Sequence, residues 1–265
     1  MKKLIPLLIL LLCGIVQSQN RFKYVLHFKI DSTDRNMVQQ ENFNLDYIDG
    51  KSIFYSEALA NLDSVRNAGT SIYRSDVPDP KLDYIITFDS QNRKLTFTET
   101  IGFSMYRVEE PRSINWKITN ETKSIDGYNA QKAVCNFGGR NWTAWFTKDI
   151  SIPAAPYKFT GLPGLIVSLA DDDNDYVFNL ASIQKIQKLY DFRSFEKLGI
   201  KTIQVDYAKY AELKKQFVDN PEMLFYQIPG QSGLDLPASE IKVLADAMRE
   251  RQKKLNNPIE LKLSN

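Results

Sequence analysis

The sequence predicts a mainly β protein of the α+β class. We expect a curved antiparallel meander or half-barrel sheet with two to three helices, one late helix packing on the sheet. Short apolar segments alternate with polar residues along much of the chain, polar turns separate them, and few segments have helical spacing. The chain has 265 residues, of which 43% are hydrophobic and 12% aromatic, so it can bury one sizeable core.

Strands are expected at short intervals between residues 22 and 183. In the first, every second residue from Phe22 to Ile30 is apolar, and these side chains share one face because a strand alternates between its two sides. A polar turn separates the segments 84–88 and 94–98, which is the pattern of a hairpin. The other expected strands are 114–119, 131–137, 142–148, 165–170 and 176–183.

Three segments have helical composition. The first is 57–68, which ends before Gly69, and the second runs to Val218 from Asp206, its expected N-cap. The third, 237–255, has apolar residues at helical spacing and charges on the opposite face. We expect this helix to pack on the sheet, because a helix gains most of its stability by burying its apolar stripe. The alternative is that the helix is offered to a partner.

The start of the chain has the pattern of a secretory signal peptide. A basic beginning is followed by an apolar stretch from Leu4 to Val16, and Ser18 is a small residue at the cleavage position. A lipid anchor on Cys13 is the alternative, but it requires a small residue before the cysteine, where a leucine stands. We therefore expect a signal peptide at 1–18 and one domain at 19–265, located in the periplasm or associated with the outer membrane.

Charge and cysteine content narrow the classes of partner. The chain has 34 Lys and Arg against 32 Asp and Glu, and removal of Lys2 and Lys3 with the signal peptide balances the two. A neutral protein has no electrostatic basis for binding nucleic acid, so no such partner is expected. Cys135 is the one cysteine left after cleavage, which excludes an intramolecular disulfide and indicates a small core residue.

Residues for the common catalytic chemistries are missing. The chain has one histidine, His27, and it has no nucleophile-elbow, phosphate-loop or dinucleotide motif. We therefore expect no cofactor and no enzymatic activity, with a carboxylate-based envelope hydrolase as an alternative. Glu109 and Glu110 point to opposite faces of a strand and are interpreted as a solvated strand end. Candidate calcium ligands, in a segment that a polar hairpin turn also explains, are Asp171, Asp173 and Asp175.

The tryptophans are the candidates for a binding surface. Aromatic side chains concentrate binding energy, and Trp116, Trp142 and Trp145 lie in or beside the central strands. Alternation places Trp142 and Trp145 on opposite faces, so one can lie in the core while the other stays near the surface. The alternative is that all three belong to the core.

The most informative segment is Gly161, Leu162, Pro163, Gly164, Leu165 and Ile166, which we call the GLPGLI segment. Pro163 and Gly164 suit the central positions of a type II turn, which requires a positive φ at the glycine. Leu165 and Ile166 begin an apolar run that is typical of a buried strand. We expect the glycines and the proline to serve the turn rather than to contact a ligand.

This segment resembles the signature of the GLPGLI family, secreted envelope proteins of Bacteroidota with no settled activity. The resemblance extends to 116–128, 139–150, 157–160 and 256–261, and so covers essentially the whole mature chain. It implies a periplasmic, non-enzymatic binding or accessory protein that partners an outer-membrane, TonB-dependent transport system. The layout is also similar to that of periplasmic lipoprotein carriers, which implies, as an alternative, a lipid or other apolar ligand beneath the helix 237–254.

Overall fold

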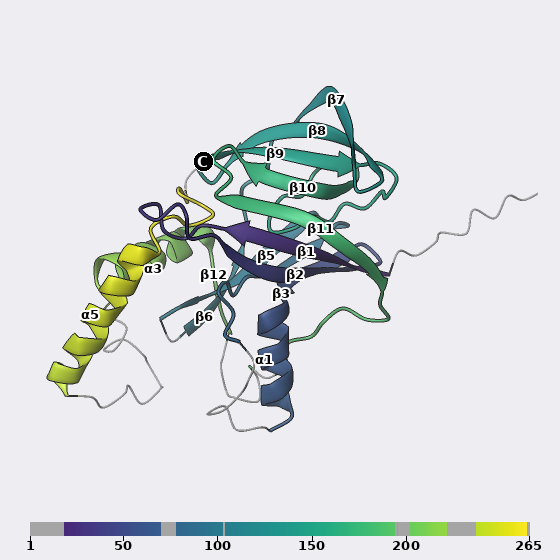
Figure 1. Cartoon of the computed structure of the whole chain (residues 1–265). Helices are drawn as coiled ribbons and strands as arrows, with labels where there is room; N and C mark the ends of the chain where they lie inside the picture. The colour runs from purple at the N-terminus through teal and green to yellow at the C-terminus, as the bar shows by residue number, and fades with distance from the viewer. Residues whose placement is uncertain are drawn as a thin grey trace, which may run out of the picture.

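The computed structural model describes residues 19–69, 78–102, 104–193, 195, 202–221 and 237–263. Within these residues, twelve strands form one open sheet that curls, and three helices accompany it (Figure 1). The mainly β fold class predicted from the sequence is therefore confirmed. The expected signal peptide lies outside the described residues.

The strands are β1 (Asn20–Phe28), β2 (Gln39–Ile48), β3 (Lys51–Ser56), β4 (Ile85–Asp89), β5 (Lys94–Ile101), β6 (Ser104–Glu109), β7 (Lys117–Ile125), β8 (Tyr128–Phe137), β9 (Arg140–Thr147), β10 (Leu165–Asp171), β11 (Tyr176–Lys185) and β12 (Thr202–Val205). Their order in the sheet is β12-β6-β5-β4-β3-β2-β1-β11-β10-β9-β8-β7. The pairing is antiparallel except between β12 and β6, which are parallel. The first strand thus lies in the middle and joins the two halves of the chain through β2 and β11.

Each strand expected from the sequence is present, with β7 beginning at Lys117 rather than at residue 114. The sequence analysis does not predict β2, β3, β6 or β12. The turn between β2 and β3 is Asp49-Gly50, with positive φ of 50° and 85°, which is the geometry of a type I′ hairpin. This Asp-Gly pair is the signal in the sequence that could have identified both strands.

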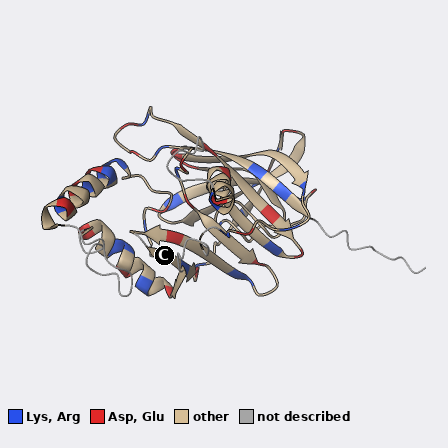
Figure 2. Cartoon of the chain, turned by 90° about the horizontal axis from the view of Figure 1, so that it is seen from below, with Lys and Arg blue, Asp and Glu red and all other residues tan. Residues whose placement is uncertain are grey.

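All three expected helices are present as α1 (Glu57–Asn67), α3 (Tyr207–Asp219) and α5 (Ala238–Lys254). Asp206 caps α3 as predicted, since its carboxylate accepts a hydrogen bond from the backbone N–H of Lys209 at 2.7 Å. The helix expected to pack on the sheet is 237–255, and this part of the prediction is wrong, because α5 extends away from the sheet (Figures 1 and 2). The late helix that packs on the sheet is α3, which contacts β5 and β6. No described helix is both long enough and apolar enough to cross a membrane.

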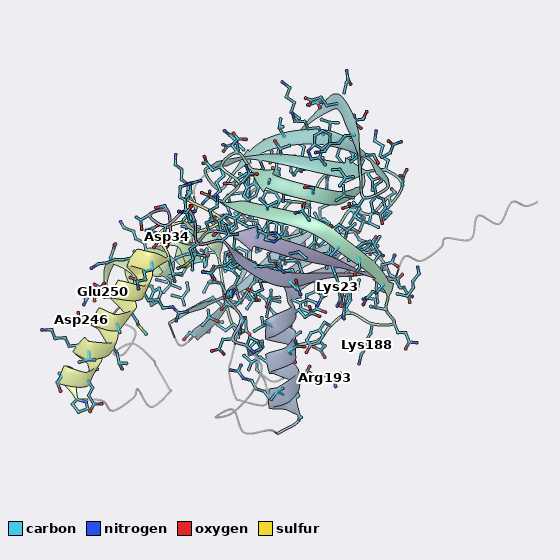
Figure 3. The ribbon with its side chains drawn as sticks, in the orientation of Figure 1. Lys23, Asp34, Lys188, Arg193, Asp246 and Glu250 are labelled. Atoms are coloured by element: carbon cyan, nitrogen blue, oxygen red, sulfur yellow. The ribbon has the colours of Figure 1, made fainter. Side chains whose placement is uncertain are left out.

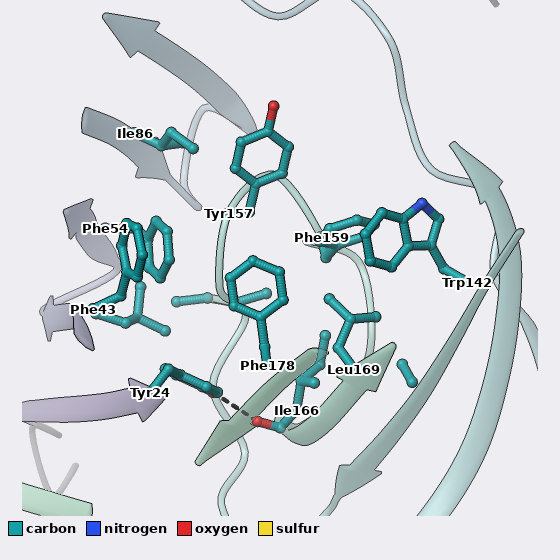
Figure 4. Close-up of a cluster of buried hydrophobic side chains, with 14 of the residues drawn as sticks. Tyr24, Phe43, Phe54, Ile86, Trp142, Tyr157, Phe159, Ile166, Leu169 and Phe178 are labelled. Atoms are coloured by element: carbon teal, nitrogen blue, oxygen red, sulfur yellow. Dashed lines mark hydrogen bonds between the residues drawn. The ribbon is translucent and has the colours of Figure 1, made fainter. Parts of the chain in front are cut away.

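Most of the core lies on one side of the sheet, which we call the inner face (Figure 4). The apolar side chains of β1 from Phe22 to Phe28 are fully buried there, as their alternation predicts. The loop 148–164 crosses this face: the Tyr157 ring lies 5.1 Å from that of Tyr84 beside β4, and the Phe159 ring lies 4.5 Å from that of Trp142 on β9. The inner face is therefore filled by the chain's own aromatic side chains.

The segment 256–263, which we call the C-terminal strap, also lies against the inner face. The backbone N–H of Asn257 donates to the carbonyl of Ile30 at 3.0 Å, and the N–H of Leu261 donates to the carbonyl of Gly138 at 2.7 Å. Ile259 between them is buried in the core. The strap therefore connects the end of β1 to the turn between β8 and β9.

Candidate binding site

The GLPGLI segment is explained by backbone geometry. The positive φ falls on Gly161 (106°) and not on Gly164, so the predicted type II turn is wrong. Gly164 is required for a different reason, because a Cβ atom there would lie 2.0 Å from the carbonyl oxygen of Thr147. A Cβ atom on Gly161 would meet the indole of Trp116 at 3.5 Å, an ordinary contact. One glycine thus permits a left-handed conformation, and the other permits two backbone segments to touch.

A buried hydrogen bond ties this segment to the middle of the sheet. The register between β10 and β9 shifts between Ile166 and Ser168, and the carbonyl of Ile166 accepts a bond from the Tyr24 hydroxyl at 2.6 Å (Figure 4). Burial raises the pKa of Tyr24 well above its ordinary value, so the phenol remains a donor. The GLPGLI segment is therefore fixed to β1.

The three tryptophans do not form one surface. Trp142 is buried on the inner face, where its Nε1 donates to the carbonyl of Phe137 at 3.0 Å, so its candidacy as a binding residue is wrong. Trp145 points to the other face, as alternation predicts, and the Nζ of Lys123 lies 4.0 Å from the centre of its ring. Trp116 is half-buried against the approach to the GLPGLI segment, where its Nε1 donates to the carbonyl of Thr160 at 3.0 Å.

Cys135 belongs to the same core. It is buried, and burial raises the pKa of its thiol to about 12. Its predicted role as a small core residue is confirmed, and the thiol stays protonated at physiological pH.

Arg140, at the start of β9, anchors the C-terminal strap. Its guanidinium donates to the side-chain oxygen of Asn257 at 2.5 Å and to the carbonyls of Pro258 at 2.8 Å and Ile259 at 3.2 Å. Charged donors of this kind make strong, well-oriented hydrogen bonds. Two of the segments that resemble the GLPGLI family, 139–150 and 256–261, are therefore in direct contact.

The three candidate calcium ligands do gather in one place. One carboxylate oxygen from each of Asp171, Asp173 and Asp175 lies within 4.8 Å of the others. Positive side chains already contact the two buried members: Arg140 lies 2.8 Å from Asp171, and Arg35 lies 2.8 Å from Asp175. The chain itself thus neutralises much of this cluster, which we interpret as structural.

Four buried charged side chains, one of them from the strap, pair with one another, and we call them the inner ion network. They are Glu110, Arg112, Lys158 and Glu260, and each side chain is less than a tenth exposed. Arg112 contacts Glu110 at 2.7 Å and Glu260 at 2.5 Å, and Lys158 contacts the same two carboxylates at 2.9 and 2.7 Å. Tyr157 adds a hydrogen bond to Glu260 at 2.5 Å. Two cations balance two anions, which makes their burial tolerable.

The cations keep both carboxyl groups ionised. Burial would raise the pKa of Glu260, but Lys158 and Arg112 outweigh burial and hold it at about 2. The pKa of Glu110 is lowered against the effect of burial in the same way. The prediction that Glu109 and Glu110 form a solvated strand end is therefore right for the first, which is exposed, and wrong for the second, which is buried. The available signal was alternation, which places Glu110 on the side of the buried Val108.

A cavity of about 180 Å³ lies beside this network. Its lining includes Glu99, which accepts hydrogen bonds from Tyr210 and from the Nζ of Lys214, the latter at 2.9 Å. Pockets for ligands typically measure about 300–1,000 Å³. This cavity is smaller than that range, so by itself it does not hold the acyl chain of the carrier alternative. Of the three carboxylates in its lining, Glu99 and Glu260 are held by lysine and arginine side chains, whereas Asp83 has no ion pair among the described residues and burial raises its pKa.

The other side of the sheet, the outer face, carries a large hollow of about 1040 Å³, which we call the outer groove. Alternate residues of five neighbouring strands form its floor, because their neighbours in sequence point to the inner face. The floor therefore mixes hydroxyl, amide and alkyl groups with few charges. Its residues are Ile53, Ile85, Thr87, Lys94, Thr96, Thr98, Met105, Arg107, Thr202 and Gln204.

The wall of the outer groove is aromatic. Tyr190, Phe192 and Phe195 are half-buried, with ring centroids 4.8 Å apart between the first two and 5.8 Å apart between the last two. Tyr55 of β3 supports them from below, 5.0 Å from the ring of Tyr190. Lys188 and Arg193, labelled in Figure 3, lie on this same segment beside α1. A second hollow of about 810 Å³ lies between α1 and residues 186–193.

A smaller pocket adjoins the outer groove, and we call it the end pocket. It measures about 150 Å³ and shares Ile85, Thr98, Met105 and Phe195 with the groove. Arg66 of α1 and Asp83 also line it. The Nε of Arg66 is buried and has no hydrogen-bond partner among the described residues. Sequence reasoning missed this whole surface, because its parts lie far apart in the chain.

These features define the class of the protein: an open, curled β-sheet with a filled inner face and a large groove on its outer face. Comparison with known proteins agrees with the fold. Residues 107–212, less than half of the chain, match the family described as N-glycanase peptide, N-terminal domain. No curated protein matches the chain.

Two solved structures of PNGF-II are similar to this chain. The structure in space group C2 has a TM-score of 0.52 and 17% sequence identity, over 74% of this chain and 32% of that one. The structure in space group P21 has a TM-score of 0.52 and 16% identity, over 74% of this chain and 33% of that one. The likeness concerns the fold, and this chain spans about a third of the length of PNGF-II.

Proposed function

We propose that this chain is a non-enzymatic binding or accessory module of the bacterial cell envelope. It acts in the periplasm or at the outer membrane and partners a TonB-dependent transport system. The observation that carries the proposal is the contrast between the two faces. The inner face is packed and its charges are paired, whereas the outer groove presents half-exposed aromatic rings, which are the residues that dominate binding energies.

Three further observations support the proposal. The start of the chain has the pattern of a secretory signal peptide, and the GLPGLI resemblance implies an outer-membrane partner. The similarity to an N-glycanase N-terminal domain supports a module that accompanies another activity, since this chain spans about a third of PNGF-II. In the inner cavity, ion pairs hold two of the three lining carboxylates, Glu99 and Glu260, so Asp83 lacks the second free carboxyl group that glycosidase chemistry needs.

Cross-linking in the native envelope tests this proposal. The chain carries an affinity tag, and the proteins recovered with it are identified by mass spectrometry. Thr96→Arg places a long charged side chain in the outer groove, and Thr143→Arg places the same side chain on β9, outside the groove. We expect an identified outer-membrane transporter with the wild type and with Thr143→Arg, and its loss with Thr96→Arg. Recovery of no transporter, or equal recovery with both variants, contradicts the proposal.

A further inference from the structure

The end pocket has the features of a site for one polar end of a ligand. The buried Nε–H of Arg66 lacks an acceptor among the described residues, and a buried donor without a partner is costly. The side chains of Thr98, Thr100 and Asp83 line the same space. The pKa of Asp83 is raised mainly by burial and further by the nearby charge of Glu99. The pocket therefore offers hydrogen-bond donors and acceptors that a ligand can satisfy.

Apolar surface lies directly beside these polar groups. Met105 and Phe195 line both the end pocket and the outer groove, and the Phe192 ring stacks on that of Phe195 at 28° between their planes. Threonines of β4 and β5 then continue along the floor of the groove. A matching ligand has apolar ring faces next to hydroxyl-bearing edges, because aromatic side chains bind the former and hydrogen bonds fix the latter.

The charges at the edge of the groove are largely neutralised. Lys94 pairs with Glu109 at 2.8 Å, and Asp191 pairs with Arg193 at 2.9 Å. Arg107 of the floor has no ion pair among the described residues, and one such cation is too little charge to favour a polyanion. An apolar ligand would leave the Arg66 Nε–H unsatisfied. An extended peptide gains most of its affinity from a free strand edge, and it would therefore lie along β12 at the border of the groove, whereas the groove floor is the side-chain face of paired strands.

We propose that the outer groove and the end pocket bind a neutral carbohydrate chain, with one sugar in the end pocket and the next ones along the aromatic wall. This inference shares one element with the proposed function, on which it rests: the binding surface is the outer face of the sheet. The outer groove, at about 1040 Å³, already reaches the upper end of the range of about 300–1,000 Å³ that is typical of ligand pockets, and the end pocket adds about 150 Å³, so the two together are large enough for a short oligosaccharide.

Titration of the purified chain tests the inference. The probes are neutral trisaccharides (maltotriose, cellotriose, mannotriose and chitotriose), with trigalacturonate as an anionic control, and binding is followed by calorimetry. We expect saturable binding of at least one neutral trisaccharide. Thr98→Val and Arg66→Lys each remove one hydrogen-bonding group while keeping size or charge, so each should weaken binding about tenfold. Thr143→Val, the same change on β9, should leave the affinity unchanged.

Two results overturn the inference: no neutral trisaccharide binds, or Thr98→Val and Arg66→Lys bind as tightly as the wild type. A melting curve of each variant shows whether it is folded. If no sugar binds but Thr96→Arg still loses the transporter, the carbohydrate inference fails and the proposed function stands. If sugar binding depends on Thr98 but no transporter is recovered, the proposed partnership fails and the carbohydrate inference stands.

Discussion

The inner and outer faces are built from the same strands and differ in how they are filled. On β3, Phe54 points inward and stacks on Phe43 at 4.9 Å, whereas Tyr55 points outward and supports the half-exposed ring of Tyr190. Inside, the four carboxylate and cationic groups of the inner ion network bind one another. Outside, a large groove stays open, and the Nε of Arg66 beside it has no acceptor among the described residues; inside, the Nη1 of Arg112 also has none, although its other nitrogens bind Glu110 and Glu260.

Most of the segments that resemble the GLPGLI family contribute to the packed inner face, and the exception is 116–128, where β7 is largely exposed. Arg140 holds the strap, Lys158 and Tyr157 hold Glu260, and Gly164 lets its loop touch the end of β9. Each of these contacts joins segments that are distant in the chain. The difference teaches that the GLPGLI signature maintains the architecture, while the proposed ligand surface lies outside the signature segments.

The largest effect is expected from the inner ion network. Glu260→Ala leaves Arg112 and Lys158 with one buried carboxylate between them, and breaking a buried pair in this way costs roughly 3–5 kcal/mol. Denaturant unfolding measures the loss. Glu109→Ala is the matched control, because its pair with Lys94 is about half exposed and such pairs contribute about 0–1 kcal/mol. Equal losses would show that the network does not support the inner face.

The same network predicts sensitivity to acid. The folded state holds the pKa of Glu260 at about 2, below the value of about 4.3 for an unfolded chain. A lowered pKa means that the carboxylate stabilises the fold above the unfolded value, and that this contribution is lost as the pH falls from about 5 toward 2. Unfolding free energies measured across this range should fall more steeply for the wild type than for Glu260→Gln. Parallel curves would contradict the assignment.

Gly164→Val should destabilise the fold by about 3 kcal/mol, because its Cβ atom would overlap the carbonyl of Thr147 and the backbone must move. Gly161→Ala should cost less, about 1–2 kcal/mol, since its penalty is only the positive φ. Thermal unfolding measures the loss of stability in each variant. The ratio of the two losses distinguishes the cost of backbone overlap at Gly164 from the cost of a positive φ at Gly161. A larger loss at Gly161 would reverse this explanation.

Tyr24→Phe should cost about 1–2 kcal/mol, because it leaves the buried carbonyl of Ile166 without its donor. Its ring and volume remain, so packing is preserved. Hydrogen exchange of the β10 amides provides the measurement, and their protection should fall more than that of the β4 amides. Unchanged protection would mean that this bond does not fix the GLPGLI segment.

The smallest effect on stability is expected in the outer groove. Thr96→Arg changes a partly exposed residue without a buried partner group, and such changes usually stay within about 0.5 kcal/mol. Its melting temperature should therefore match that of Thr143→Arg. A large loss would show that Thr96 supports the fold, and would remove the contrast between a structural inner face and a binding outer face.

The regular parts of this fold follow from local patterns, and the irregular parts do not. Alternation identifies β1, β4, β5 and β8 to β11 because each has one apolar side. β2 escapes detection because it also buries polar residues: Asp46 is fully buried and binds Arg21 of β1 at 2.6 Å. β12 is short, exposed and paired with a distant strand, so its own sequence carries little signal.

The site is less predictable than the fold. Lone residues such as Trp142 cannot reveal their burial, since alternation fixes opposite faces but does not say which face is the core. The outer groove combines Ile53, Thr96 and Gln204 with an aromatic segment after β11, and the sheet topology alone brings these together. The inner ion network is hidden in the same way, because Glu110 and Glu260 meet only in the folded chain.

Site-specific photo-cross-linking in the native envelope tests the central claim most directly. A photoreactive amino acid is placed at Thr96 in the outer groove and, in a second protein, at Pro163, an exposed residue of the GLPGLI segment. We predict a covalent adduct with an outer-membrane transporter from Thr96 and none from Pro163. An adduct from Pro163 alone would contradict the account, because the GLPGLI segment would then be the contact surface and the outer groove would not contact the transporter.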